Sequence, residues 1–188
     1  MTFHYLIHES PLGKIMLVSN KTAITGIHIV HGKYVPAVQS DWVHARNHSV
    51  LKQAQQELDA YFAGKLQTFA VPLAPHGTVF QKSVWTALTT IPYGETRTYG
   101  QQALAIGQPA AARAVGAANG RNPIGIIVPC HRVIGASGAM TGYAGGLDAK
   151  KFLLDLEASF GSLHRICLPP FQKVGFGIRS PRKRAHLA

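Results

Sequence analysis

The sequence of 188 residues contains little cysteine: Cys130 and Cys167 are the only two. Two cysteines cannot form the multi-bridge framework of a small secreted domain, and they fit a reducing compartment in which thiols stay free. Also missing is any apolar run near the length of about 20 residues that a membrane-spanning helix needs, and the first residues lack a signal-peptide pattern. We therefore expect a cytoplasmic protein that does not enter a membrane and has a free thiol available for chemistry.

Acidic residues are scarce as well, with 8 Asp and Glu against 19 Lys and Arg and a formal net charge of +11. A chain with 46% hydrophobic and only 14% charged residues is globular rather than disordered. The basic excess favours a polyanionic partner such as nucleic acid, because Lys and Arg release condensed counterions when they neutralise phosphates. A solvated basic surface without a partner is the alternative.

The positive charge is unevenly distributed along the chain. Residues 165–188 carry six basic and no acidic side chains, which leaves +5 of the total for the rest. Within the rest, residues 97–151 hold six basic side chains against the single acid Asp148. This central region is the favoured nucleic-acid face. Residues 161–188 are predicted to be a basic tail, which is either a disordered, solvated end or an aid to DNA affinity.

The first half of the sequence predicts a small antiparallel sheet followed by a helix. Three short β-rich segments are separated by turn signals. They are residues 3–8, 13–19 and 23–30. Apolar residues then recur at helical spacing from Ser49, a good N-cap, until Gly64 stops the run. The stretch 66–77 contains two prolines and a glycine, so we expect an irregular linker and an N-terminal α/β domain over residues 1–76.

The second half is predicted to be mainly helical. Thr78 can cap a first helix and Asp148 a last one, and two short helices between them flank a turn at Gly107. This pair predicts a helix-turn-helix, although alanine-rich helix pairs also occur in proteins that do not bind DNA. The predicted fold class is therefore α+β. It comprises the small N-terminal antiparallel sheet with its helix and then a mainly helical, winged-helix-like catalytic domain over residues 77–160.

The segment that carries most chemical information is NPIGIIVPCHRVIG, residues 122–135. Its apolar run leads to Cys130 and His131. Cysteine attacks as the thiolate, and an ordinary thiol with a pKa of about 8.5 is mostly protonated at neutral pH, so an imidazole is the usual activator. Adjacent side chains point in different directions, so we expect these two groups to communicate through a water or a turn. The alternative is that Cys130 is only a small buried hydrophobic residue.

Glu157 is the candidate that orients the histidine. It follows Leu153 and Leu154 by four and three residues and so shares the apolar face of its helix. A carboxylate on that face needs a partner, and His131 can provide it. A surface glutamate on a helix of slightly different register is the alternative.

Several further motifs accompany this segment. They are FQKSVWTALTTIPYGETRTYGQ at 80–101, AARAVGAANGRNP at 111–123, PCHRVIG at 129–135, TGYAGG at 141–146 and LLDLE at 153–157. Together they resemble the 6-O-alkylguanine-DNA alkyltransferases, also called methylated-DNA-protein-cysteine methyltransferases. The resemblance covers the family's catalytic domain, here residues 78 to about 158, whereas the N-terminal half is similar only loosely.

The resemblance implies a DNA repair reaction in which an alkyl group moves irreversibly from the 6-oxygen of guanine, or the 4-oxygen of thymine, to Cys130. His131 corresponds to the base that takes the thiol proton through water, and Glu157 to the carboxylate that holds it. Tyr99 corresponds to the tyrosine that helps rotate the target phosphate and donates to the base. Asn122 corresponds to the asparagine that links the helix-turn-helix to the active-site strand.

The resemblance also assigns the DNA face and the base pocket. Arg113 corresponds to the finger that fills the space left by the extruded nucleotide, and small residues beside it allow close approach to the minor groove. The DNA-binding candidates are Ala112, Arg113, Ala114, Gly116 and Arg121. The pocket candidates are Gly125, Val133, Tyr143, Ala144 and Gly145. Gly125 and Ala144 stand where relatives can carry a proline or a hydroxyl, which predicts a relatively open pocket.

The partner implied is double-stranded DNA carrying alkylated guanine, bound by a monomer that requires no cofactor. Six histidines among the first 48 residues suggest a metal site, but no cysteine or tight spacing supports one, so we expect none. Three other functions stay open. They are a damage-binding protein that does not repair, a helix-turn-helix regulator with the thiol as a sensor, and a cysteine hydrolase.

Overall fold

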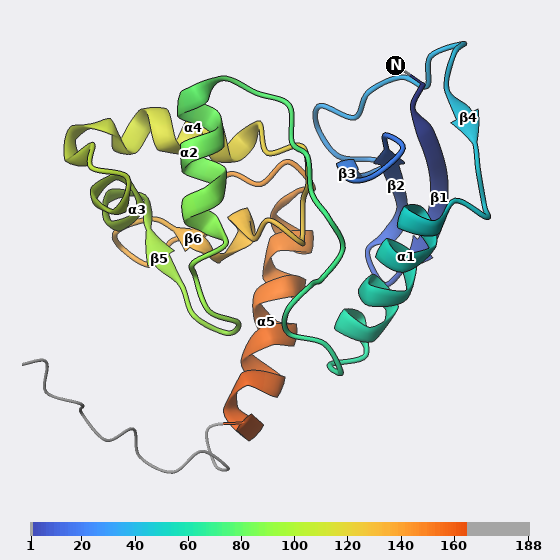
Figure 1. Ribbon diagram of the computed structural model, residues 1–188. Coiled ribbons are helices and arrows are strands. Elements are labelled where there is room, and N and C mark those ends of the chain that lie inside the picture. Colours follow the sequence, from blue (N-terminus) through green and yellow to red (C-terminus); the bar gives the residue numbers. More distant parts are fainter. Residues whose placement is uncertain (1, 165–188) are drawn as a thin grey trace, which may run out of the picture.

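The structure is a computed structural model that describes residues 2–164. Most of the predicted tail, residues 165–188, lies outside this range, and so does Cys167. The sheet and the first helix form one side of the molecule, and the helices that follow next in the chain lie on the other (Figure 1). No helix in the described part of the chain has the length and apolar character needed to cross a bilayer.

The N-terminal meander is confirmed, but the sheet is larger than predicted. Its strands are β1 (His4–Ser10), β2 (Gly13–Ser19), β3 (Ile24–Ile29) and β4 (Val43–His44). The first three pair antiparallel, whereas β4 pairs parallel with β1 and gives the order β3-β2-β1-β4. The sheet is therefore mixed: the predicted antiparallel pairing holds for β1, β2 and β3, whereas the parallel strand β4 was not predicted. A strand of two residues shows no alternation in the sequence, and only its distant partner makes it a strand.

Helix α1 (Ser49–Phe62) packs its apolar side on this sheet through fully buried Leu51, Ala54 and Leu58. It ends near Gly64, whose φ of +70° favours glycine, as predicted. Ser49 was predicted as the N-cap, but the N-cap lies one residue earlier. Ser49 is the first helical residue, and the N-cap is His48, whose side chain makes no capping hydrogen bond. The ring of His48 packs against that of His4 instead, with centroids 4.5 Å apart and the ring planes tilted by 32°.

The second half contains short helices, as predicted. Its elements are α2 (Val79–Leu88), β5 (Arg97–Thr98), α3 (Tyr99–Ala105), η1 (Pro109–Ala111), α4 (Ala112–Gly120), η2 (Cys130–Arg132), β6 (Val133–Ile134) and α5 (Leu147–His164). Thr78 caps α2 in a reciprocal capping box with Gln81. Gly107, at a φ of +72°, makes the turn between α3 and α4. Asp148 was predicted to cap α5 but lies in its first turn, where its charge complements the helix dipole.

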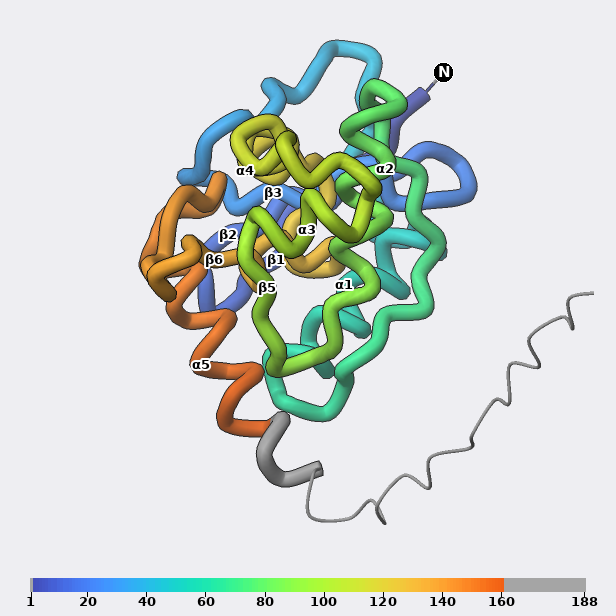
Figure 2. Tube along the Cα trace, turned by 90° about the vertical axis from the view of Figure 1, so that its left-hand side faces the viewer, coloured from blue at the N-terminus to red at the C-terminus, as the bar shows by residue number. Residues whose placement is uncertain are grey.

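The two halves share one hydrophobic core and a hydrogen-bonded seam. Residues 63–78 run along one flank from α1 to α2 (Figure 2). The outer edge of β3 pairs with this linker at Ile24 and Leu73, and with the segment before Cys130 at Ile27 and Ile124. An exposed sheet edge is thereby covered. The active-site segment is consequently held by the N-terminal sheet.

Candidate active site

The chain reaches Cys130 through two tight turns. Ile126 has a φ of +70°, and the amide of Ile127 donates to the carbonyl of Gly125 at 2.8 Å, which is the pattern of a rare γ-turn. The amide of Cys130 donates to the carbonyl of Val128 at 2.8 Å, across Pro129. A β-branched residue in the left-handed region costs about 1–3 kcal/mol, so the surroundings must hold this segment in place.

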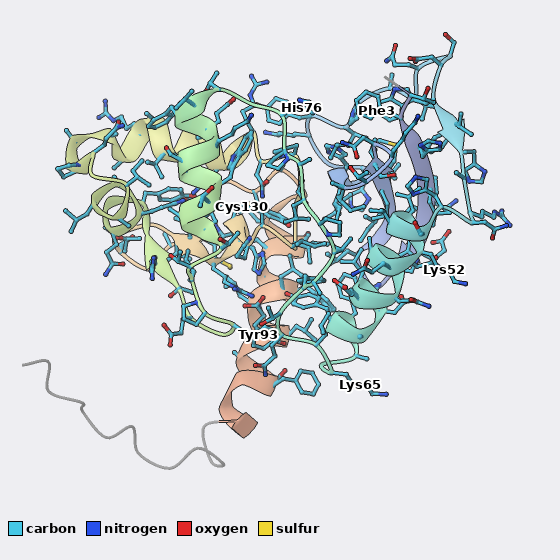
Figure 3. All side chains as sticks on the ribbon, viewed as in Figure 1. Phe3, Lys52, Lys65, His76, Tyr93 and Cys130 are labelled. Atoms are coloured by element: carbon cyan, nitrogen blue, oxygen red, sulfur yellow. The ribbon has the colours of Figure 1, made fainter. Side chains whose placement is uncertain are left out.

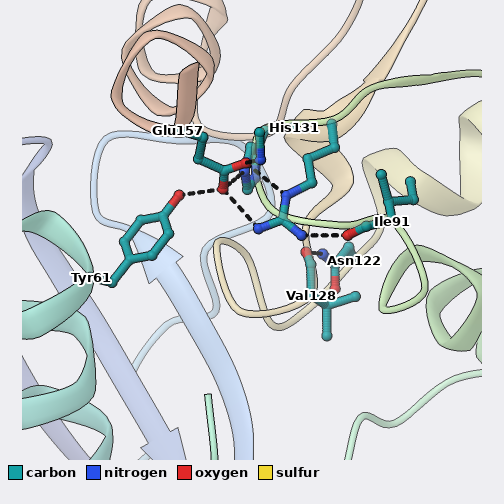
Figure 4. Close-up of polar contacts among 8 residues, drawn as sticks. Tyr61, Ile91, Asn122, Val128, His131 and Glu157 are labelled. Carbon is teal, nitrogen blue, oxygen red and sulfur yellow. Dashed lines mark hydrogen bonds and ion pairs between the residues drawn. The ribbon is translucent and has the colours of Figure 1, made fainter. Parts of the chain in front are cut away.

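Asn122 provides much of that support. Its side-chain oxygen accepts from the amide of Ile124 at 3.1 Å, and its Nδ2 donates to the carbonyl of Val128 at 2.8 Å (Figure 4). Nδ2 also lies 3.3 Å from Sγ of Cys130 and donates to it. Asn122 therefore connects the end of α4 to the thiol of Cys130. Its hydrogen bond positions the sulfur atom and favours the thiolate form of Cys130.

His131 is fully buried, and its Nε2 lies 2.9 Å from Oε1 of Glu157. A carboxylate only accepts hydrogen bonds, so Nε2 carries the proton and Nδ1 keeps a lone pair. Nδ1 has no hydrogen-bond partner among the described residues. Burial lowers the pKa of His131, although the hydrogen bond with Glu157 opposes this. The ring is thus a neutral imidazole whose free nitrogen can accept a proton.

Glu157, 1% exposed, is the centre of a buried polar cluster (Figure 4). Nε and Nη2 of Arg132 donate to its two oxygens at 2.8 and 2.9 Å, and the hydroxyl of Tyr61 donates at 2.7 Å. Burial alone would raise the pKa of this carboxyl, but the bonds from His131 and Arg132 outweigh it and lower the pKa to about 2. Glu157 therefore stays ionised and fixes the histidine.

Sequence reasoning missed Arg132 and Tyr61. Tyr61 lies on the apolar face of the helix predicted from Ser49, a position that indicates only packing, and its partner is 96 residues away. Arg132 lay inside the most informative motif, where an arginine in an apolar segment should have signalled a buried partner. Nη1 of Arg132 also donates to the carbonyl of Ile91, at 2.6 Å.

Cys130 is 7% exposed and lies on the helical side of the molecule, away from Lys52 and Lys65 (Figure 3). Burial raises the pKa of its thiol, and the hydrogen bond from Asn122 and the charge of Lys150 oppose the rise. Lys150 itself is fully buried, and its Nζ donates to the carbonyls of Val133 and Thr141 at 2.6 and 2.9 Å. It too was missed, although it precedes Leu153 by three residues and so shares the buried face of α5.

Beside Cys130 lies a cavity of about 190 Å³. Of the predicted pocket residues, Gly125, Tyr143, Ala144 and Gly145 line it, together with Asn122 and Arg121. Val133 does not, because its side chain is fully buried in β6. Tyr99 is also absent from the lining, and its hydroxyl donates to the carbonyl of Thr141 at 3.2 Å.

The predicted DNA-binding residues lie mostly on α4. Arg113 and Ala114 are exposed, whereas Ala112 and Gly116 are half-buried. A β carbon on Gly116 would lie 3.6 Å from the ring of Tyr99, so helix and ring are already close. Arg121, one residue beyond α4, places its guanidinium carbon 4.2 Å from the centroid of the Tyr34 ring.

Within residues 2–164, no three His, Cys, Asp or Glu side chains come together as metal ligands would. The pair of His4 and His48 has no third potential ligand of these types beside it in this range.

Residues 3–75 match the ribonuclease-like domain of 6-O-methylguanine DNA methyltransferase, and residues 79–159 match the DNA binding domain of the same family. The chain belongs to this family. The motif-based resemblance is confirmed, and the match also covers the N-terminal half. A curated member, the methylated-DNA-protein-cysteine methyltransferase of Methanosarcina acetivorans, is 56% identical over 156 residues, covering 83% of this chain and 99% of that protein.

Solved structures of the family agree in fold. The Mycobacterium tuberculosis O6-methylguanine methyltransferase superposes with a TM-score of 0.77 at 50% identity, covering 84% of this chain and 93% of the other. The M. tuberculosis OGT in complex with DNA gives 0.78 at 49% identity, covering 84% and 94%. The α+β class is thereby confirmed.

Proposed function

We propose that this protein repairs DNA by transferring an alkyl group from the 6-oxygen of guanine to Sγ of Cys130, once per molecule. One observation carries the proposal. The thiol of Cys130 lines a cavity and accepts a hydrogen bond from Asn122, and the next residue, His131, is a neutral imidazole oriented by the buried carboxylate of Glu157. The family to which the chain belongs, and the names of its relatives, support the same reaction.

The proposed reaction begins with a proton leaving the thiol. Because burial raises the pKa of Cys130, the resting group is the neutral thiol. A water passes its proton to Nδ1 of His131, and Glu157 stabilises the resulting imidazolium. The thiolate attacks the alkyl carbon, so the S–C bond forms as the C–O bond breaks. Tyr99 is the proposed donor: its hydroxyl leaves the carbonyl of Thr141 and gives a proton to the departing guanine, which leaves as the neutral base. The proton held on His131 then returns to Tyr99 through solvent, so the proton lost by the thiol ends on guanine.

The DNA face is proposed on α3 and α4. A lesion oxygen inside a duplex is out of reach of a buried thiol, so the nucleotide has to be extruded into the cavity. Arg113 is exposed on α4 and can fill the gap, while Ala114 and Gly116 let the helix approach the groove closely. Arg121 lines the cavity and is exposed, so it can contact the extruded nucleotide.

The proposed organisation has an N-terminal domain over residues 1–76, a catalytic domain over residues 77–160, and a monomer that binds duplex DNA carrying alkylated guanine. The irregular linker favours this division. The two parts share one hydrophobic core, and β3 forms hydrogen-bonded bridges to the linker and to the segment before Cys130. These contacts imply that the two parts act together.

The test is stoichiometric. Incubation with excess duplex containing 6-O-methylguanine should add one methyl group per chain, on the peptide that contains Cys130, because a thioether has no route back to the thiol here. Cys130→Ala should bind the duplex and transfer nothing, and Cys167→Ser should behave as the wild type. Repair of many lesions per molecule, or methylation of Cys167, would refute the mechanism. Binding without transfer by the wild type would favour a damage-binding protein.

A further inference from the structure

Tyr34 has an unusual conformation on the loop that follows β3. Its side chain is 57% exposed, yet its φ is +61°, in the left-handed region that residues with a side chain seldom adopt. Such a conformation persists only where neighbouring contacts hold it. The backbone amide of the preceding residue, Lys33, donates to the carbonyl of Ala144 at 2.7 Å. The amide of Gly32 donates to the carbonyl of Ile29 at 2.8 Å.

The ring of Tyr34 is held from the other side by Arg121. The guanidinium carbon lies 4.2 Å from the ring centroid, within the range of a cation–π contact. Arg121 follows α4 in the helical half, whereas Tyr34 belongs to the N-terminal half. The contact therefore joins the two halves of the molecule.

This contact lies at the cavity beside Cys130. Tyr34, Arg121 and Tyr143 all line that cavity, and Gly125 adds no side chain to it. Its volume of about 190 Å³ is smaller than the roughly 300–1,000 Å³ of typical small-molecule sites, so the cavity is narrower than the relatively open pocket expected from Gly125 and Ala144. A ring that lines so small a cavity limits the room left for a group beside the thiol.

We propose that Tyr34, held by Arg121, is a specificity-determining residue that limits the size of the group able to reach Cys130. The proposal deepens the transfer function proposed above and rests on it for the identity of the substrate. An exposed cation–π contact is weak, and release of the ring allows Tyr34 to leave its left-handed conformation. The ring is therefore a movable outer wall: small alkyl groups pass it, and larger ones have to displace it.

The first test uses no DNA and so does not depend on the repair reaction. Iodoacetamide and its bulky N-benzyl derivative are reacted with the full chain, and modification of Cys130 is followed by peptide mass spectrometry, separately from Cys167. Tyr34→Ala should raise the rate ratio of the bulky to the small reagent by roughly fivefold, the factor expected for an exposed cation–π contact. Arg121→Gln should raise it in the same direction, and Tyr34→Phe, which keeps the ring, should leave it unchanged.

Val38→Ala is the matched control, because Val38 lies on the same loop, is 46% exposed and does not line the cavity. It should leave the ratio unaltered. An unchanged ratio in Tyr34→Ala, an equal acceleration of both reagents, or the same effect from Val38→Ala would overturn the proposal.

The second test separates this proposal from the repair function. The free bases 6-O-methylguanine and 6-O-benzylguanine are offered to wild type and Tyr34→Ala, and the benzyl to methyl ratio should again rise by roughly fivefold. If neither base transfers its group while the iodoacetamide ratio changes as expected, the repair function fails and the size limit stands. If both bases transfer and the ratio does not change, the size limit fails and the repair function stands.

Discussion

Replacing Glu157 by glutamine should destabilise the protein strongly, although the two side chains have nearly the same shape. The change removes the charge that faces the guanidinium of Arg132, whose residue is only 7% exposed. An uncompensated buried charge costs about 3–5 kcal/mol. The variant should therefore lose about 3 kcal/mol of the free energy of unfolding at pH 7, and its histidine should lose its fixed orientation.

The pH dependence gives an independent value for the same loss. The pKa of Glu157 falls from an ordinary 4.5 to about 2 in the folded protein, which corresponds to about 3 kcal/mol of stabilisation. Because the folded pKa is the lower one, this stabilisation is fully present above about pH 4.5 and is lost as the pH falls toward 2. The difference between wild type and Glu157→Gln should shrink by about 2 kcal/mol between pH 5 and pH 3.

Urea unfolding, followed by the fluorescence of Trp42 and Trp85, measures both effects. The control is Asp155→Asn on the same helix, whose side chain is 64% exposed and pairs with exposed Lys151. That change should cost less than about 1 kcal/mol at either pH. A loss below about 1 kcal/mol for Glu157→Gln at pH 7, or a deficit equally large at pH 3, would refute the reasoning about the buried cluster.

Two further predictions concern the reaction. Arg113→Ala should slow repair of duplex DNA roughly 30- to 100-fold, the cost of unstacking without a wedge, and change the reaction with free 6-O-methylguanine less than about twofold; equal losses on both substrates, measured as single-turnover rates, would contradict the finger assignment. Lys150→Met should slow alkylation of Cys130 by iodoacetamide at pH 7 roughly three- to tenfold, because loss of a nearby positive charge raises the thiol pKa. Exposed Lys151 supplies the control, and Lys151→Met should leave the rate unchanged.

Local signals in the sequence predicted local structure well. The cap at Thr78, the turn glycines and the three strands all depend on residues within a few positions of one another. Glu157 was also found on the correct face, because a carboxylate on an apolar helix face is informative by itself. The motifs identified the family, and the comparisons confirmed it.

Features created by distant contacts could not be predicted in this way. Strand β4 exists only because β1 pairs with it. Tyr61 takes part in the polar cluster only because the fold brings its hydroxyl to Glu157. The left-handed conformation of Ile126 contradicts the preference of a β-branched residue, so no propensity could have indicated it. The bonds that hold this conformation come from Asn122 and from the β3 edge.

The strained turn before Cys130 also explains why the N-terminal half matters although it supplies no member of the reacting pair. The amide of Ile27 donates to the carbonyl of Pro123 at 2.8 Å, and the amide of Gly125 donates back to Ile27 at 3.2 Å. These two bonds immediately precede Ile126, whose conformation costs about 1–3 kcal/mol, and two net hydrogen bonds contribute about that much. The helical half alone would have to hold the turn through Asn122, at the end of α4. The β3 edge therefore supports the turn that positions the thiol, so the geometry at Cys130 depends on a sheet that supplies neither the thiol nor the imidazole.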